Sequence, residues 1–190
     1  MARQIDQQKR DDLLEKAVEG LAYTGVTDTA LRTLAAHMGT SARMLIYYFG
    51  SKESLILDVL AHQQRLFAAA EPDVEPAIDT LRTYLLTDWE ALTRGHKKPG
   101  VRILEQVFGA ACAENSPYRD YAAETLTGLT RTLAARFTAA GMPTEIADLR
   151  AHLALSSLQG LLMMHFTADD PEHIDDIFRR LVDEVLLAPW

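Results

Sequence analysis

Apolar residues recur at three- and four-residue spacing along nearly the whole chain, a pattern typical of amphipathic helices. The first such segment runs from about Asp6 to Thr24, and Gly25 follows as a helix terminator. Its apolar face consists of Leu13, Leu14, Ala17, Val18 and Leu21. No segment carries a strong strand signal, because strict alternation of apolar and polar positions is missing. The pattern therefore predicts an all-α protein.

Residues 29–49 predict two short helices joined by a tight turn. Thr29 can cap the first helix, because its hydroxyl can accept a free backbone N–H. Gly39 can adopt the left-handed backbone that ends a helix, and Thr40 or Ser41 can cap the second helix. The inward stripe of that second helix is Leu45, Tyr48 and Phe49. This arrangement is a helix-turn-helix, whose second helix enters the major groove of DNA.

The rest of the chain predicts six longer helices, separated by segments rich in Pro and Gly. Their expected ranges are 51–70, 76–94, 101–113, 117–140, 144–168 and 171–188. Glu53 is placed for a capping box with Ser51, Thr144 can cap the fifth of these helices, and Pro171 opens the last. Residues 71–76 should break the first, and Lys97 and Lys98 should lie in a solvated loop.

The run LRTLAAHMGTSARMLIYYFGSKESL resembles the N-terminal signature of the tetracycline-repressor (TetR) family of bacterial transcriptional regulators. The matching elements are Leu34-Ala35, Gly39, Ser41, Leu45, Tyr47, Phe49 and Ser51-Lys52-Glu53-Ser54-Leu55. An aromatic-rich helix end followed by Ser-Lys-Glu is uncommon among helix-turn-helix proteins. The resemblance implies a helix-turn-helix DNA-binding domain at residues 1–50 and a ligand-binding and dimerisation domain at residues 51–190. It also implies a repressor that a small molecule releases from a near-palindromic operator.

The last two predicted helices differ from the others. Residues 146–166 are apolar on most of the helix circumference, so this helix should be buried on more than one side. The final helix has a narrower apolar stripe and a charged opposite face that includes Asp175. The resemblance implies a homodimer in which helices 144–168 and 171–188 of each subunit form a four-helix interface. Gly160, as a small residue on the first of these helices, would let another helix come close. The alternative is that both helices close a monomeric core.

The candidate DNA-binding residues are Thr29, Thr40, Ser41, Arg43, Met44, Tyr47 and Lys52. Arg43 could pair with the O6 and N7 atoms of guanine, or it could contact phosphate or remain solvated. Met44 could touch a thymine methyl group or simply pack. The resemblance implies phosphate contacts for Tyr47 and Lys52, while Ala42 and Ile46 replace residues that often contact phosphate in the family.

The net charge of −8 does not exclude a nucleic-acid partner, because the acidic excess is distributed unevenly. Residues 1–55 hold seven basic and seven acidic side chains, so all the excess acidity lies further along the chain. Phosphate affinity depends on local Lys and Arg. The single cysteine, Cys112, excludes an internal disulfide and suits the cytoplasm, where we expect this protein. The most apolar stretch, residues 153–166, is too short and too polar to cross a membrane.

No residue pattern predicts catalysis, a cofactor or a metal site. The segment 169–173 contains metal-ligand types but is better explained as a helix start, with Pro and acids near the positive end of the dipole. His152 and His165 are too far apart on one helix to share an ion. We expect Cys112 to be a buried thiol. The sequence therefore favours a protein that is not an enzyme.

A small-molecule pocket is expected between the helices of the larger domain, mainly apolar and open to a hydrophobic effector. Its candidate residues are Tyr84, Trp89, Phe108, Tyr121 and Met163, with Ser156, Gln159 and His165 as polar partners. Each of these side chains could instead fill the core. Two alternatives stay open: a helix-turn-helix regulator that acts without a ligand, as an activator or under a protein partner, and a small helical enzyme.

Overall fold

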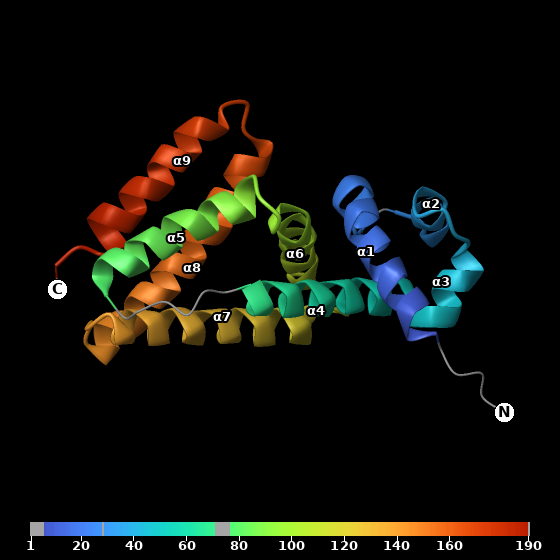
Figure 1. Ribbon diagram of the computed structural model, residues 1–190, viewed down its shortest axis with the longest axis horizontal. Helices are drawn as coiled ribbons and strands as arrows, with labels where there is room; N and C mark the ends of the chain where they lie inside the picture. The colour runs from blue at the N-terminus through green and yellow to red at the C-terminus, as the bar shows by residue number, and fades with distance from the viewer. Residues whose placement is uncertain (1–5, 28, 71–76, 190) are drawn as a thin grey trace. The chain divides into compact units, whose positions relative to one another are not determined.

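The computed structural model describes residues 6–27, 29–70 and 77–189, and for residues 66–70 it describes the backbone alone. Helices connected by short turns make up this part of the chain, and it contains no strand, which confirms the all-α prediction. The elements are α1 (Gln7–Thr24), α2 (Leu31–His37), α3 (Ala42–Phe49), α4 (Lys52–Ala70), α5 (Ile78–Thr93), α6 (Lys98–Ala111), α7 (Arg119–Ala139), α8 (Thr144–Thr167), α9 (Pro171–Arg180) and the π-helical segment η1 (Leu181–Leu186) (Figure 1).

The chain divides into two compact units, one of Met1–Glu71 with Pro99–Ala122 and the other of Pro72–Lys98 with Ala123–Trp190. The expected domain boundary after residue 50 stays a prediction, and in the structure α4 lies in the same compact unit as α1 to α3. The apolar face of α4, with Leu55, Ile56 and Val59 all at 0% exposure, is part of the same core as α1 to α3. Three short helices bury too little apolar surface by themselves, so α4 and most of α6 complete their core.

The first unit is built around a continuous apolar core. The predicted inward face of α1 is buried, and α3 contributes Leu45 and Phe49 at 1% and 6% exposure. From α6 come Ile103 and Val107, both at 0% exposure. Each fully buried aliphatic side chain stabilises the fold by about 1.5–3 kcal/mol relative to an exposed one.

Arg10 links α3 to two other helices of the first unit. The guanidinium of Arg10 on α1 bonds the Asp58 carboxylate on α4. The same group lies over the Phe49 ring at the end of α3, 5.2 Å from the ring centroid. Arg10 therefore joins three helices of the first unit, and a cation over an aromatic face adds about 0.5–1 kcal/mol at an accessible site.

The helix termini confirm some predicted caps and correct others. Ser41 caps α3 by accepting from the Met44 N–H at 3.2 Å, and Gly39 has a positive φ of 66°. Thr29 is not the cap of α2, which starts after Ala30 without a side-chain cap, because its hydroxyl donates to the Thr24 carbonyl at 2.7 Å.

Two further cap predictions were wrong. The capping box does not form at Glu53, because the residue three positions after Ser51 is Ser54, whose N–H bonds Ser51 Oγ at 3.0 Å. Thr144 is the first helical residue of α8, and the residue before it, Pro143, occupies the N-cap position without a side-chain hydrogen bond. The predicted break at residues 71–76 lies outside the described residues.

The second unit is held by an aromatic pair and several long-range polar contacts. Trp89 on α5 stacks on Phe178 on α9, with ring centroids 4.3 Å apart, and both side chains are buried. Arg150 on α8 donates to the backbone carbonyls of Leu186 and Ala188 at 2.8 and 2.7 Å. These bonds satisfy carbonyls at the end of η1 that helix geometry leaves free.

Three local predictions outside the helix-turn-helix were wrong. Cys112 is exposed, because it lies in the turn after α6 ends at Ala111. Lys97 is not solvated, since its side chain is 12% exposed and pairs with Asp88, and Lys98 begins α6. Asp175 does not face solvent, because its side chain is 16% exposed and points into a polar network. None of the described helices has the length and apolar character needed to cross a bilayer.

Candidate nucleic-acid interface

Helix α3 has one anchored face and one free face. Leu45 and Phe49 are buried in the core, whereas Met44, Ile46 and Tyr47 are 37%, 46% and 47% exposed. Apolar side chains exposed together on one face are one of the marks of a binding surface. The free face of α3 is therefore the leading candidate for a contact surface.

Charge and aromatic groups accompany this apolar surface. Arg43 is exposed one position into the first turn of α3, close to the helix start where recognition helices meet base edges. Tyr47 lies edge-on against Tyr48, with ring centroids 5.1 Å apart, and Tyr48 is half-buried against the core. Tyr48 thus supports the ring of Tyr47, as its predicted packing position implies.

The remaining candidate DNA-binding residues have varied surroundings. Ser41 is exposed but uses its hydroxyl as the cap, and Thr40 is half-buried at the turn. Thr29 is 7% exposed, and its hydroxyl donates to the Thr24 carbonyl across the loop before α2. The Lys52 ammonium donates to the Thr27 carbonyl at 3.0 Å, which leaves two of its three donors for another partner.

An aromatic pair on the first unit was missed in the sequence. Tyr23, at the end of α1, is 83% exposed, and its ring stacks on His37 with centroids 5.6 Å apart and an angle of 14° between the planes. Neither residue belongs to an apolar stripe, so periodicity does not indicate that they meet. Only the packing of α1 on α2 brings them together.

The candidate ligand-binding residues do not form one cluster. Phe108 and Tyr121 belong to the first unit, where the Tyr121 hydroxyl accepts from Gln64 at 3.1 Å. In the second unit Met163 is 64% exposed, and the Ser156 hydroxyl bonds its own helix at His152. Tyr84 lies beneath the Arg136 guanidinium, 4.1 Å from ring centroid to cation, and Gln159 is half-buried.

The structure does bring two of those candidates together. His165 on α8 lies edge-on to the Trp89 ring, with centroids 5.6 Å apart, and both side chains are buried. Beside them is a hollow of about 190 Å³ lined by residues of α5 and α9: Leu86, Trp89, Glu90, Asp175, Phe178 and Arg179. The hollow thus combines an aromatic floor with charged walls.

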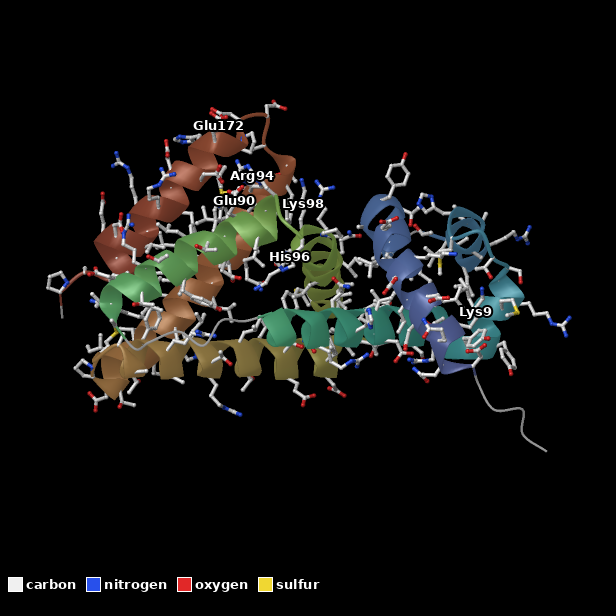
Figure 2. The ribbon with its side chains drawn as sticks, in the orientation of Figure 1. Lys9, Glu90, Arg94, His96, Lys98 and Glu172 are labelled. Atoms are coloured by element: carbon white, nitrogen blue, oxygen red, sulfur yellow. The ribbon has the colours of Figure 1, made fainter. Side chains whose placement is uncertain are left out.

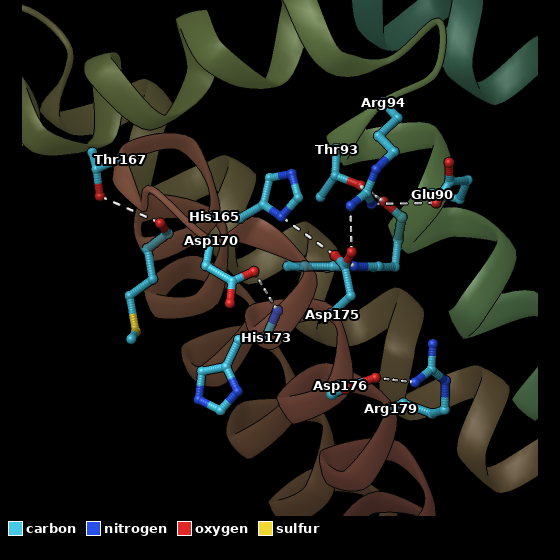
Figure 3. A network of polar contacts seen from close by, with 12 residues as sticks. Glu90, Thr93, Arg94, His165, Thr167, Asp170, His173, Asp175, Asp176 and Arg179 are labelled. Carbon is cyan, nitrogen blue, oxygen red and sulfur yellow. Dashed lines mark hydrogen bonds and ion pairs between the residues drawn. The ribbon is translucent and has the colours of Figure 1, made fainter.

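Asp175 is the centre of the polar network in this unit (Figure 3). Its carboxylate accepts from Trp89 Nε1 at 2.8 Å and from the Arg94 guanidinium, and it lies 3.3 Å from His165 Nδ1. Arg94 also reaches the Glu90 carboxylate near the end of α5 (Figure 2). The sequence signal for Asp175 was misleading, because acidic neighbours made it look like part of a solvated face.

This network shifts the pKa of its titratable members. Burial alone would raise the pKa of Asp175, but the hydrogen bonds from Arg94 and Trp89 outweigh it and hold the pKa below its usual range. Burial lowers the pKa of His165, and Arg94 and Lys98 lower it further against the opposing effect of Asp175. His165 is therefore neutral at pH 7 while Asp175 is charged.

The acidic segment before α9 has a structural explanation. Asp170 caps α9 by accepting from the His173 N–H at 3.3 Å, and Pro171 occupies the first helical position. Within the described residues, no group of His, Cys, Asp and Glu side chains has the arrangement of a metal site. The cap at Asp170 and the position of Pro171 confirm that this segment starts a helix.

The fold and the free face of α3 place this chain in the class of helix-turn-helix regulators. The family described as "Bacterial regulatory proteins, tetR family" matches residues 13–59. The family described as "Transcriptional regulator LmrA/YxaF-like, C-terminal domain" matches residues 77–180, which is more than half of the chain. The chain therefore belongs to the TetR family of bacterial regulatory proteins, as the sequence signature predicted. Proteins of this family bind DNA and dimerise.

Individual relatives agree with this family. The HTH-type transcriptional repressor NicS of Pseudomonas putida is 32% identical over 97 residues, a match that spans 49% of this chain and 45% of the repressor. A transcriptional regulator from Rhodococcus sp. Rha1 has a similar fold, with a TM-score of 0.73 and 19% identity over 93% of this chain and 95% of its own.

A second solved structure has the same fold at a similar level of sequence identity. It is NalD, the secondary repressor of the MexAB-OprM multidrug efflux pump in Pseudomonas aeruginosa. Its TM-score is 0.62 at 20% identity, covering 97% of this chain and 100% of NalD.

Proposed function

We propose that this chain is a transcriptional repressor that binds a near-palindromic DNA site as a homodimer and is released by a small hydrophobic effector. The observation that carries the DNA-binding part is the free face of α3. Its side chains are exposed while the opposite face is fixed in the core, so the helix can enter a groove without losing its own packing. Exposed Arg43 adds a donor suited to base edges or phosphate.

The dimer part of the proposal rests on one face of α8. Leu149, Leu153, Met163 and Met164 are 66%, 42%, 64% and 48% exposed in the single chain. They are spaced so that they share a face with Gly160, where an added Cβ would meet no atom within 4 Å. An exposed apolar stripe around an open glycine suits close packing against the same helix of a second copy.

The effector part of the proposal is supported by the hollow beside Trp89 and His165. Its aromatic floor and its three charged side chains, Glu90, Asp175 and Arg179, offer a small molecule both apolar and polar contacts. Tyr84 and Gln159, both half-buried, stay candidates in this unit, and Phe108 and Tyr121 stay candidates in the other unit. Met163 belongs to the exposed face of α8. A cytoplasmic location follows from the proposal, because the target is chromosomal DNA.

A regulator that acts without a ligand is the second candidate, and the size of the hollow favours it. A volume of about 190 Å³ is below the roughly 300–1,000 Å³ of typical ligand pockets. A thermal-shift screen of hydrophobic compounds, followed by DNA release, separates the two candidates. An effector that stabilises the protein must also lower its DNA affinity, because linkage between two sites is reciprocal.

The decisive test of DNA binding is selection from random duplexes at low salt with the purified full chain. We expect an inverted repeat whose half-sites are about one helical turn, or a multiple of it, apart. A Tyr47→Ala, Arg43→Ala double variant serves as control, since both side chains are exposed and should not affect folding. If wild-type protein enriches no sequence above input, the proposed function is wrong.

A further inference from the structure

The loop between α1 and α2 is bonded to a side chain from a distant helix. Val26 donates its backbone N–H to Gln106 Oε1 on α6 at 2.9 Å, across 80 positions of sequence. The other end of the same amide is also engaged, because Gln106 Nε2 donates to the Arg102 carbonyl of its own helix at 3.0 Å. The second bond fixes the orientation of the amide, so its oxygen faces the loop.

The loop passes against this amide with little space between them. Gly25 has a φ of +86°, and a Cβ added there would lie 3.2 Å from Gln106 Oε1. Val26 is 1% exposed, so water cannot readily replace the glutamine as acceptor for its N–H. A buried N–H that loses its acceptor costs about 1–3 kcal/mol, so the loop should stay bonded to α6 in the folded state.

This loop leads directly into the helix-turn-helix. After Val26, the Thr27 carbonyl accepts from Lys52 Nζ at 3.0 Å, and the Thr29 hydroxyl returns to the Thr24 carbonyl at 2.7 Å. Ala30, the next residue, is the cap of α2, and α2 packs on α3. The position of the loop therefore sets where α2 begins and how α3 is presented.

We propose that Gln106 is a positioning residue for DNA binding, which holds the α1–α2 loop through the Val26 N–H and thereby orients α3. This inference rests on the proposed DNA-binding function. Gln106 contacts neither phosphate nor base in this role. Its loss should therefore weaken binding to every DNA sequence without changing sequence preference or salt dependence.

The test compares Gln106→Met with Gln64→Met in the chain of 190 residues. Methionine keeps the length and packing of glutamine but accepts no comparable hydrogen bond. Gln64 is the matched control, because it is in the same unit and makes one long-range bond, to the Tyr121 hydroxyl at 3.1 Å, away from the loop. The readouts are affinity for the selected inverted repeat, its salt slope, melting temperature and hydrogen exchange of the Val26 amide.

We expect Gln106→Met to bind DNA about threefold to tenfold more weakly, as the loss of one net hydrogen bond predicts. The Val26 amide should exchange faster by a similar factor, while the salt slope stays that of wild type. Gln64→Met should leave both DNA affinity and Val26 exchange unchanged. If Gln106→Met does not fold, Gln106→Asn replaces it, because it keeps an amide but cannot reach the loop.

Three outcomes overturn the inference. The first is a Gln106 variant with wild-type DNA affinity. The second is an equal loss of affinity in both variants, which would indicate general destabilisation. The third is a reduced salt slope in Gln106→Met, which would indicate a direct phosphate contact. If the wild-type chain selects no DNA at all, the proposed function itself fails, and the Val26 exchange rates alone then show whether Gln106 holds the loop.

Discussion

Trp89 on α5 donates its indole N–H to the Asp175 carboxylate on α9 at 2.8 Å, beneath the stacked ring of Phe178. The same carboxylate receives the Arg94 guanidinium and faces His165 Nδ1. A single acidic side chain thus links α5, α8 and α9 in the second unit. Its removal would leave a buried indole N–H without an acceptor, which is the most costly consequence.

Asp175→Ala should lower the free energy of unfolding by about 1–3 kcal/mol, most of it from the unsatisfied Trp89 N–H. Arg94 contributes less, because its partly exposed side chain can be hydrated again. Urea unfolding measures the effect. The control is Asp176→Ala, whose carboxylate is 66% exposed and pairs with Arg179 on the surface. Equal losses in the two variants would show that the Asp175 network does not stabilise the unit.

His165 should make the second unit less stable in acid. Its pKa is lowered by burial in the folded state, so the folded protein binds this proton less readily than the unfolded chain. The stabilisation is complete above an unfolded pKa of about 6.5 and is lost as the pH falls through that value towards the lower folded pKa.

Melting temperatures between pH 5 and 8 test this dependence. His165→Asn should flatten the profile relative to wild type, because it removes the group whose pKa is lowered in the folded state. Identical profiles for wild type and His165→Asn would contradict the expected titration.

Glu105 has the opposite pH dependence in the first unit. Burial raises its pKa from 4.5 to about 7 in the folded protein. The contribution of its protonated form to stability is therefore fully present below about pH 4.5 and is lost as the pH rises through 7. Glu105→Gln should therefore stabilise the protein at pH 8 by about 1–2 kcal/mol, less than the full shift implies because the carboxyl is partly solvated. At pH 4 the variant should match wild type in urea unfolding. Destabilisation at pH 8 would show that the charged carboxylate has a favourable partner.

Arg43 and Lys52 should affect DNA binding differently. Arg43→Ala should relax preference at one base pair per half-site, at a cost of about 1–3 kcal/mol for that base. Lys52→Ala should weaken binding to all sequences and reduce the salt slope by about one unit, with a further loss from the broken bond to Thr27. Binding to single-base variants of the selected site, at several salt concentrations, measures both. A uniform loss in both variants would make Arg43 a phosphate contact.

Gly160→Leu should weaken the homodimer without unfolding the subunit. An added Cβ at Gly160 meets no atom within 4 Å in the single chain, so the bulk would be felt only across the interface. Overpacking a close helix crossing costs about 1–3 kcal/mol, which raises the dissociation constant by about fivefold to 150-fold. Sedimentation measures it. Gly128→Leu on α7 is the control, because that glycine is also exposed and surrounded by open space. Dissociation by both variants alike would place the interface elsewhere.

The sequence determined the local parts of this protein. Ser41 caps α3, Gly39 adopts positive φ, and Leu45 and Phe49 anchor the recognition helix, all as predicted. These features depend on residues within one or two turns of each other, where backbone geometry and helical periodicity leave few choices. Family membership followed from the same short stretch.

Tertiary structure decided which distant side chains meet. The sequence pattern placed Asp175 on the charged face of α9, whereas in the folded protein its carboxylate accepts from Trp89 on α5. No residue near Gln106 in the sequence indicates its bond to Val26. Thr29 and Lys52 were assigned to DNA, but the folded loop also uses both of them. Whether a polar side chain is buried depends on the whole core, because several helices together exclude water from it. Only then does the side chain need a hydrogen-bond partner within the protein. The sequence pattern shows which face of one helix is apolar. It does not show which residues of another helix pack against that face.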